Sequence, residues 1–182
     1  DKDGEAGSVT TSYSIVKARI SSNGLVAAIL DGGDSTWINY YDSDGSLIAE
    51  NQTHVEDPGY PMDVAVSDNG EIMMVTYQFI DGSDTTSYVA FYNFGDVGQN
   101  EDDRIVSGYT YEGVVIPEIR YFDAERSVAL REDGFTVYKG RQIPKESVTE
   151  KVDKEIVSTF CDDDTIGMVF KNGNKDKQYT MK

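Results

Sequence analysis

The residue types that most often carry enzymatic chemistry are scarce in this chain. His54 is the single histidine among 182 residues, and no Gly-x-Ser-x-Gly turn accompanies it, so a Ser-His-Asp triad has no support. Cys161 is the single cysteine and follows Phe160 in a strand-like run, which favours a buried structural thiol over a nucleophile. Zinc sites need several His or Cys ligands, and these two residues lie far apart. We therefore predict no catalytic, cofactor-binding or metal-binding residue, and we place His54 in an exposed loop.

Carboxylates are the abundant chemical group, because Asp and Glu together number 33. They gather in short clusters, which are Asp31/Asp34, Asp42/Asp44, Glu56/Asp57, Asp81/Asp84, Glu101/Asp102/Asp103 and Asp162/Asp163/Asp164. A glycosidase needs two carboxylates at a fixed separation in a cleft, and no pair stands out. Calcium needs about 6–8 oxygen ligands, and the Asp42-x-Asp44-Gly45 pattern lacks the remaining EF-hand positions. Because Asp is also a favoured turn residue, we predict turns and no tight calcium site.

Aromatic pairs are the remaining signal of a binding surface. Four groups could stack on a sugar or a peptide, namely Tyr40/Tyr41, Phe91/Tyr92/Phe94, Tyr109/Tyr111 and Tyr121/Phe122. Their spacing is that of strands, where large aromatic side chains more often fill a core. The pattern therefore favours packing between sheets.

The charge balance narrows the class of partner. Lys and Arg number 16 against 33 acidic residues, which gives a net charge of −17 and a pI near 4.2. Such a field repels phosphate backbones and anionic lipid, so we predict no nucleic-acid partner. No stretch approaches the roughly 18 apolar residues of a membrane span, so we do not expect this segment in the membrane. The chain opens on Asp1-Lys2-Asp3-Gly4, and we expect any signal or anchor to lie outside it.

The elements that must position these residues are predicted to be strands, because a hairpin pattern repeats along the chain. Ile20-Ser21-Ser22-Asn23-Gly24-Leu25 recurs as Val66-Ser67-Asp68-Asn69-Gly70-Glu71. In each copy Asn-Gly predicts a tight type I′ turn between two antiparallel strands. Weaker copies of the strand pair begin near residues 118 and 157. We predict strands over residues 16–20, 25–30, 38–41, 64–66, 72–77, 89–92, 127–130, 135–138 and 167–170.

A third and a fourth strand follow each hairpin, as in residues 37–41 and 46–50. Units of about 40–45 residues with four short strands are the signature of β-propeller blades. We therefore predict one all-β domain over residues 1–182, built of antiparallel four-stranded sheets. It has about four blades and is either a whole propeller or a fragment of a larger one. The predicted units cover residues 14–52, 60–111, 115–150 and 155–182.

The two ends fall inside units. Residues 8–13 have the position of a lone outer strand, and the last unit stops after its third strand. Two arrangements follow: these ends meet in one composite blade, or the chain is an open arc whose edge another copy or further blades must cover. An uncovered edge also allows self-association through strand edges.

Two segments resemble a known family. Residues 88–106 contain Phe91-Tyr92-Asn93-Phe94-Gly95, and residues 59–67 read Gly-Tyr-Pro-Met-Asp-Val-Ala-Val-Ser. They resemble an uncharacterised clostridial family, a domain of unknown function, whose members carry propeller-like repeats behind one N-terminal membrane anchor. The resemblance implies a Gram-positive cell-surface location, with the anchor absent from this chain. It implies no catalytic or binding residue.

Two functions remain open after these arguments. The first is a non-enzymatic interaction or scaffold module at the cell surface, with an unknown protein or carbohydrate as partner and no cofactor. The alternative is a carboxylate-dependent hydrolase or lyase acting on carbohydrate or cell-wall polymer. The convergence of carboxylates distinguishes them, because an enzyme gathers two or three in one pocket while a module scatters them over hairpin tips.

Overall fold

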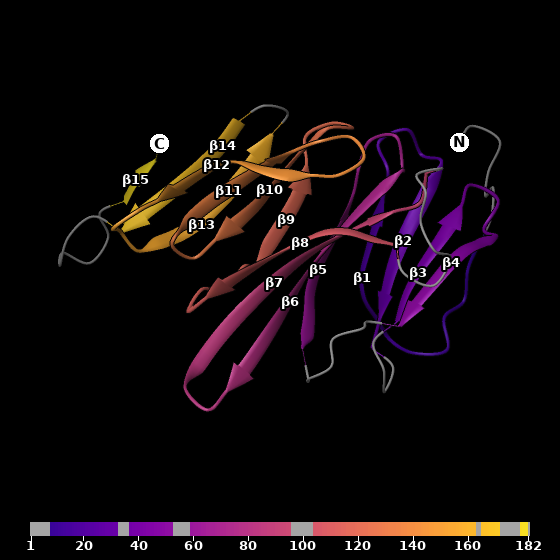
Figure 1. Ribbon diagram of the computed structural model, residues 1–182, viewed down its shortest axis with the longest axis horizontal. Coiled ribbons are helices and arrows are strands. Elements are labelled where there is room, and N and C mark those ends of the chain that lie inside the picture. Colours follow the sequence, from indigo (N-terminus) through magenta and orange to yellow (C-terminus); the bar gives the residue numbers. More distant parts are fainter. Residues whose placement is uncertain are drawn as a thin grey trace.

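The computed structural model describes residues 8–32, 37–52, 59–95, 104–162, 165–171 and 179–181, and these contain strands and turns but no helix. The strands form four antiparallel sheets that stand side by side along the molecule (Figure 1). We call them blades 1 to 4 in chain order. Blade 1 contains β1 (Ile15–Ile20), β2 (Val26–Asp31), β3 (Trp37–Asp42) and β4 (Leu47–Gln52); blade 2 contains β5 (Tyr60–Val66), β6 (Ile72–Asp81), β7 (Asp84–Asn93) and β8 (Ile105–Glu112); blade 3 contains β9 (Glu118–Tyr121), β10 (Arg126–Arg131), β11 (Gly134–Lys139) and β12 (Lys145–Lys151); blade 4 contains β13 (Ile156–Asp162), β14 (Thr165–Lys171) and β15 (Tyr179–Met181).

Each blade is a meander in which neighbouring strands of the sheet are consecutive in the chain. The first strands of blades 1 to 3, β1, β5 and β9, lie against one another at the centre of the molecule. The all-β, propeller-like prediction is therefore confirmed, and so are the nine predicted strands, to within a few residues at their ends. In the described part of the chain, blades 1 to 3 have four strands and blade 4 has three.

The prediction for the chain ends is wrong in one respect. Residues 8–14 are not a strand but an irregular segment that lies against blade 1. The Gly32 amide donates a hydrogen bond to the Ser14 carbonyl (2.8 Å), and Val9 lies beside Gly45 in the β3–β4 turn. Blade 4 stands at the opposite end of the molecule, near the end marked C (Figure 1). Within the described residues, the segment 8–14 pairs with no strand of blade 4, and the four blades form an open arc.

The repeated hairpin forms, but its turn differs from the prediction. The Gly24 amide donates to the Ser21 carbonyl (2.8 Å) and Gly70 does the same to Ser67 (2.8 Å), so the central pair of each turn is one residue earlier than Asn-Gly. Gly24 and Gly70 then take φ values of 71° and 74°, which only glycine adopts without strain. The serine decides the register: its hydroxyl donates to the Asn oxygen two residues later, at 2.6 Å in blade 1 and 2.8 Å in blade 2.

The core lies between blades. One apolar cluster joins blades 1 and 2 through Leu30, Ile38 and Tyr40 on one side and Val75 and Tyr92 on the other. A second cluster joins blades 2 and 3, and its members are Ala65, Ile72, Met74, Val89, Phe91, Ile116, Ile119, Ala129 and Tyr138. The predicted packing of aromatic residues between sheets is confirmed for residues in these two clusters.

Candidate functional site

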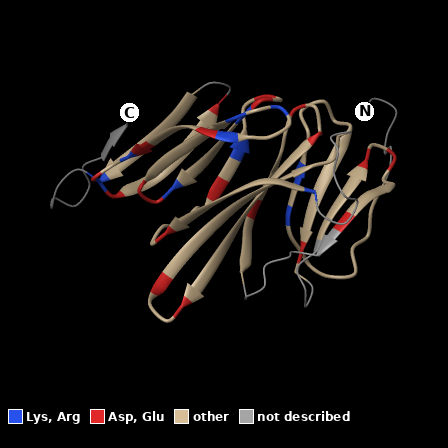
Figure 2. Ribbon diagram, viewed as in Figure 1, with Lys and Arg blue, Asp and Glu red and all other residues tan. Residues whose placement is uncertain are grey.

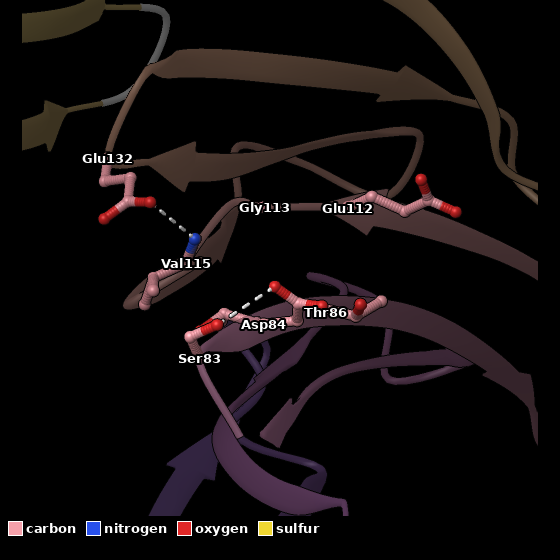
Figure 3. A pocket seen from close by; sticks show the side chains of 8 residues that line it. Ser83, Asp84, Thr86, Glu112, Gly113, Val115 and Glu132 are labelled. Carbon is pink, nitrogen blue, oxygen red and sulfur yellow. Dashed lines mark hydrogen bonds between the residues drawn. The ribbon is translucent and has the colours of Figure 1, made fainter. Parts of the chain in front are cut away.

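A cavity of about 650 Å³ opens between blades 2 and 3, on the side of the β6–β7 hairpin (Figure 3). Three separate turns contribute its walls. Residues 83–86 come from the hairpin, Glu112 ends β8 and is followed by Gly113 and Val115, and Glu132 lies in the turn between β10 and β11. The hairpin of blade 2 and the Glu132 turn of blade 3 are about 50 residues apart in the chain, as adjacent blades of this repeat length require, and the segment after β8 lies between them.

Backbone hydrogen bonds fix the walls of this cavity relative to one another. The Gly113 amide donates to the Thr85 carbonyl (2.7 Å), which ties blade 2's own hairpin to the exit of β8. The Glu132 amide donates to the Val115 carbonyl (3.0 Å), and the Val115 amide donates to Glu132 Oε1 (3.2 Å). These two hydrogen bonds join the β8–β9 connection to the β10–β11 turn of blade 3.

Apart from Val115, the side chains that line the cavity carry hydroxyls or carboxylates, with no lysine or arginine among the lining residues that the structure describes. Figure 3 shows that the carboxylates do not point at a common centre. Asp84 lies beside the Ser83 hydroxyl (3.5 Å), Glu132 is directed at the Val115 amide, and Glu112 extends away from both. Such groups can accept hydrogen bonds from a ligand, but they do not form the facing pair that acid–base hydrolysis requires.

A second polar feature lies where the first strands of the blades meet. Asp63 on β5 is fully buried, and its carboxylate contacts Lys17 Nζ at 3.2 Å and the Arg19 guanidinium at 3.4 Å, both from β1. The same carboxylate accepts a hydrogen bond from the Ile119 amide of β9 (3.1 Å). Asp63 therefore links three blades, and its charge is used to hold the arc together.

Next to this junction, Arg120 pairs with Glu118 at 2.6 Å on β9. Basic residues on β1 and β9 are visible near the middle of the molecule in Figure 2. Cys161 lies within electrostatic reach of both Glu118 and Arg120. Burial, reinforced by the charge of Glu118, raises the pKa of the Cys161 thiol to about 11. A thiol that stays protonated near neutral pH is a weak nucleophile, but Cys161 is half-buried and not buried as predicted.

The acidic clusters noted in the sequence differ in burial and in hydrogen-bond partners. Asp42 Oδ1 accepts hydrogen bonds from the backbone amides of Asp44 and Ser46, as expected of a turn residue. Asp31 is buried in blade 1 and accepts a hydrogen bond from Asn39 (3.0 Å). Within the described residues, no group of three or more His, Cys, Asp or Glu side chains could hold a metal ion. Outside the described part of the chain lie His54, Asp34, Glu56, Asp57, Glu101, Asp102, Asp103, Asp163 and Asp164.

Two carboxyl groups of blade 3 have a lowered pKa, and both are paired with arginine. Hydrogen bonding from Arg131 lowers the pKa of Asp133 against the opposing effect of burial. At Asp123 burial acts to raise the pKa, but hydrogen bonds from the Glu125 amide and from Arg126 lower it overall. Both groups are therefore carboxylates near neutral pH and act as ion-pair partners.

Of the cavity residues, Asp84 alone was singled out from the sequence, as part of the Asp81/Asp84 cluster. Ser83, Thr85, Thr86 and Glu112 carry no motif, and Glu132 is one acidic residue in a turn among many. Another signal for the cavity was the length of the β6–β7 hairpin, because both strands extend beyond the predicted ranges 72–77 and 89–92. Among the described residues, no helix is long and apolar enough to cross a membrane.

Comparison with known proteins agrees with this architecture. A search of curated proteins found no match. Among solved structures, the chain is similar to the dihydro-heme d1 dehydrogenase NirN in complex with DHE, with 14% identity and a TM-score of 0.58, over 91% of this chain and 34% of that chain. It is also similar to the Cps50 (Swd1) β-propeller domain of Myceliophteria thermophila, with 9% identity and a TM-score of 0.59, over 88% of this chain and 52% of that domain.

These identities show the fold alone, and the chain spans between a third and about half of the length of the two structures. A family described as a family of unknown function (DUF5711) matches residues 1–182. The chain therefore belongs to this family, and its fold is that of β-propeller blades.

Proposed function

We propose that the chain is a non-enzymatic binding module whose ligand enters the cavity between blades 2 and 3. The observation that carries the proposal is the divergence of Asp84, Glu112 and Glu132 within a cavity of about 650 Å³ (Figure 3). Hydrolysis of a glycosidic bond needs two carboxyl groups on opposite sides of one bond, and a binding site does not. The lining hydroxyls and carboxylates suit a ligand rich in hydrogen-bond donors, such as a neutral carbohydrate.

The proposed location is outside a bacterial cell, at the cell surface. Its support is the resemblance of residues 88–106 and 59–67 to a membrane-anchored family, with the anchor on a segment outside this chain. The excess of acidic residues adds support, because it disfavours nucleic acid and anionic lipid as partners. Protease treatment of intact cells tests it: degradation of the protein before a cytoplasmic marker agrees with the proposal, and protection until lysis contradicts it.

The binding proposal is tested with neutral polysaccharides and soluble peptidoglycan fragments as probes. We expect saturable binding by calorimetry with no release of new reducing ends. Glu112→Gln should weaken binding, because it removes a charged acceptor from the cavity wall, and it should leave the fold intact, because no hydrogen bond of the Glu112 side chain is found within the described residues. Glu125→Gln, in the turn between β9 and β10, is the matched control and should bind normally.

Two results would count against this function. Reducing ends released by the native chain and lost in Glu112→Gln would favour the alternative, a carboxylate-dependent hydrolase. Equal binding by Glu112→Gln and the native chain would place the ligand elsewhere on the molecule.

A further inference from the structure

The β6–β7 hairpin of blade 2 is longer than the corresponding hairpins of its two neighbours. β6 and β7 have ten residues each, whereas β2, β3, β10 and β11 have six. The extra length carries the hairpin past the ends of blades 1 and 3 (Figure 1). Exposure near its tip is therefore set by strand length in the middle of the chain, where a blade is present on each side.

The two faces of this extended hairpin are covered to different extents. Phe79 is partly buried and packs against the apolar cluster that joins blades 1 and 2. The next residue, Ile80, points to the opposite face, because side chains alternate along a strand. That face carries Ile72 and Met74 in the cluster shared with blade 3. At the tip of the hairpin it is largely uncovered, and Ile80 is 59% exposed.

Ile80 lies beside the cavity between blades 2 and 3. The strand register pairs Ile80 with Thr85, and Thr85 is one of the lining residues of the cavity. Directly opposed residues of antiparallel strands share a face, with Cβ atoms about 5 Å apart. An exposed apolar side chain therefore borders a cavity whose lining is otherwise mostly polar.

A second exposed apolar group lies on the same face. The registers pair Tyr60 with Gln78 and Gln78 with Ser87. The Ser87 hydroxyl donates to a backbone carbonyl of the β8–β9 connection (2.7 Å), which shows that this row faces blade 3. Tyr60 is 61% exposed and lies on β5, two strands and roughly 10 Å across the sheet from β7. We call Tyr60 and Ile80 the apolar platform.

The apolar platform and the cavity together match the chemistry of a sugar chain. A pyranose ring presents C–H groups on its faces and hydroxyls around its rim. The faces pack on aromatic or aliphatic side chains, while the hydroxyls donate to acceptors such as the Glu112 carboxylate of the cavity. Because Tyr60 lies roughly 10 Å across the sheet from the cavity side of the hairpin, a ligand that contacts both must be longer than one ring.

We propose that Tyr60 and Ile80 form a subsite for a neutral oligosaccharide that extends from the cavity along the blade 3 side of the β6–β7 hairpin. The inference rests on the proposed function, because it takes the cavity as the place where one end of the sugar chain binds. Ile80 packs on the ring next to the cavity and Tyr60 on a ring further out. Specificity for the length of the oligosaccharide follows from this arrangement.

The test is calorimetric titration with cello-oligosaccharides and chito-oligosaccharides of two and of six rings. We expect the six-ring form of one series to bind the native chain more tightly than its two-ring form. Tyr60→Ala should weaken binding of the six-ring form at least about tenfold and leave the two-ring form unchanged. Ile80→Ala should weaken it by a smaller factor, because less apolar area is lost. Tyr60→Phe keeps the ring and should bind nearly as well as the native chain.

Two exposed apolar residues away from the hairpin provide matched controls. Phe160 is 45% exposed on blade 4, and Ile143 is 49% exposed between β11 and β12. Phe160→Ala and Ile143→Ala should bind both lengths as the native chain does. Far-UV circular dichroism checks that each variant is folded, and Ile80→Ala carries the test if Tyr60→Ala is not.

The outcomes separate this subsite from the function on which it rests. Weaker binding of both lengths by Glu112→Gln, with no change in Tyr60→Ala or Ile80→Ala, would overturn the subsite and leave the cavity as the binding site. Equal affinity of the native chain for two and six rings would also overturn it. If neither series binds the native chain, the subsite is wrong, and the peptidoglycan fragments then test the proposed function separately.

Discussion

Blade 2 and blade 4 are built on the same meander, yet their sheets are covered very differently. Residues 72–77 of β6 are all buried, because blade 1 packs on one face and blade 3 on the other. In β13 no residue is fully buried, and Phe160 is 45% exposed. Apolar side chains of similar size are therefore buried to different extents, depending on how many blades pack on their sheet. We expect those in the interior of the arc to contribute most to the free energy of unfolding.

The largest expected effect comes from deleting an aromatic ring in the interior blade. Phe91→Ala removes a fully buried ring that contacts Tyr109 and Tyr138, and it should lower the free energy of unfolding by about 3–5 kcal/mol. Phe160→Ala makes the same chemical change on blade 4 and should cost less than about 1 kcal/mol in dilute solution. Urea unfolding measures both. Equal losses in the free energy of unfolding would show that the two phenylalanine rings are equally buried in solution.

The charge junction at the centre should have the next largest effect. Asp63→Ala leaves the Ile119 amide without its acceptor and removes the partner of Lys17 and Arg19. We expect a loss of about 2–3 kcal/mol, moderated because both cations are partly exposed and can be hydrated. Glu118→Ala removes a more exposed pair with Arg120 and should cost below about 1 kcal/mol. Chemical denaturation distinguishes them, and similar losses would argue against a linking role for Asp63.

The repeated turn allows a comparison at one residue. At Gly70 a Cβ atom would lie 2.4 Å from Val26 of blade 1, whereas at Gly24 nothing lies within 4 Å. Both glycines have a positive φ, so each change to Ala should cost about 1 kcal/mol for backbone strain. Gly70→Ala should cost about 1–2 kcal/mol more, because the clash pushes blades 1 and 2 apart. Thermal unfolding of the two variants checks this, and a larger loss for Gly24→Ala would contradict it.

The smallest expected effect is the pH dependence at Asp133. Arg131 lowers the pKa of this group, so its contribution to stability is complete above the ordinary Asp pKa of about 3.9 and is lost as pH falls through the lower folded value. Asp133→Asn should therefore cost about 1 kcal/mol near neutral pH and nothing in strong acid. Asp81→Asn, at a hairpin tip, is the control. A difference between Asp133→Asn and the native chain that persists in strong acid would show that the ion pair is not its source.

The sequence by itself determined the strands, the repeat and the aromatic core. Runs of β-branched and aromatic residues, such as residues 89–92, indicate a strand. These runs are continuously apolar and do not alternate with polar residues, because both faces of the strand are buried. The strand β12 (Lys145–Lys151) had no such signal, because every one of its residues is exposed and no apolar period records its pairing.

Tertiary structure alone decided the open arc and the polar sites. The turn register is instead local, because at Ser21 and Ser67 a side-chain hydroxyl bonds the Asn two residues later and competes with the Asn-Gly preference, so its signal lies in the repeated Ser-x-Asn-Gly sequence. Whether the ends of the chain meet depends on the small angles between successive blades, which no residue pattern encodes. Asp63 and the cavity at Glu112 are each assembled from strands or turns of adjacent blades, so their partners are set by the distance between blades and not by their spacing in the chain.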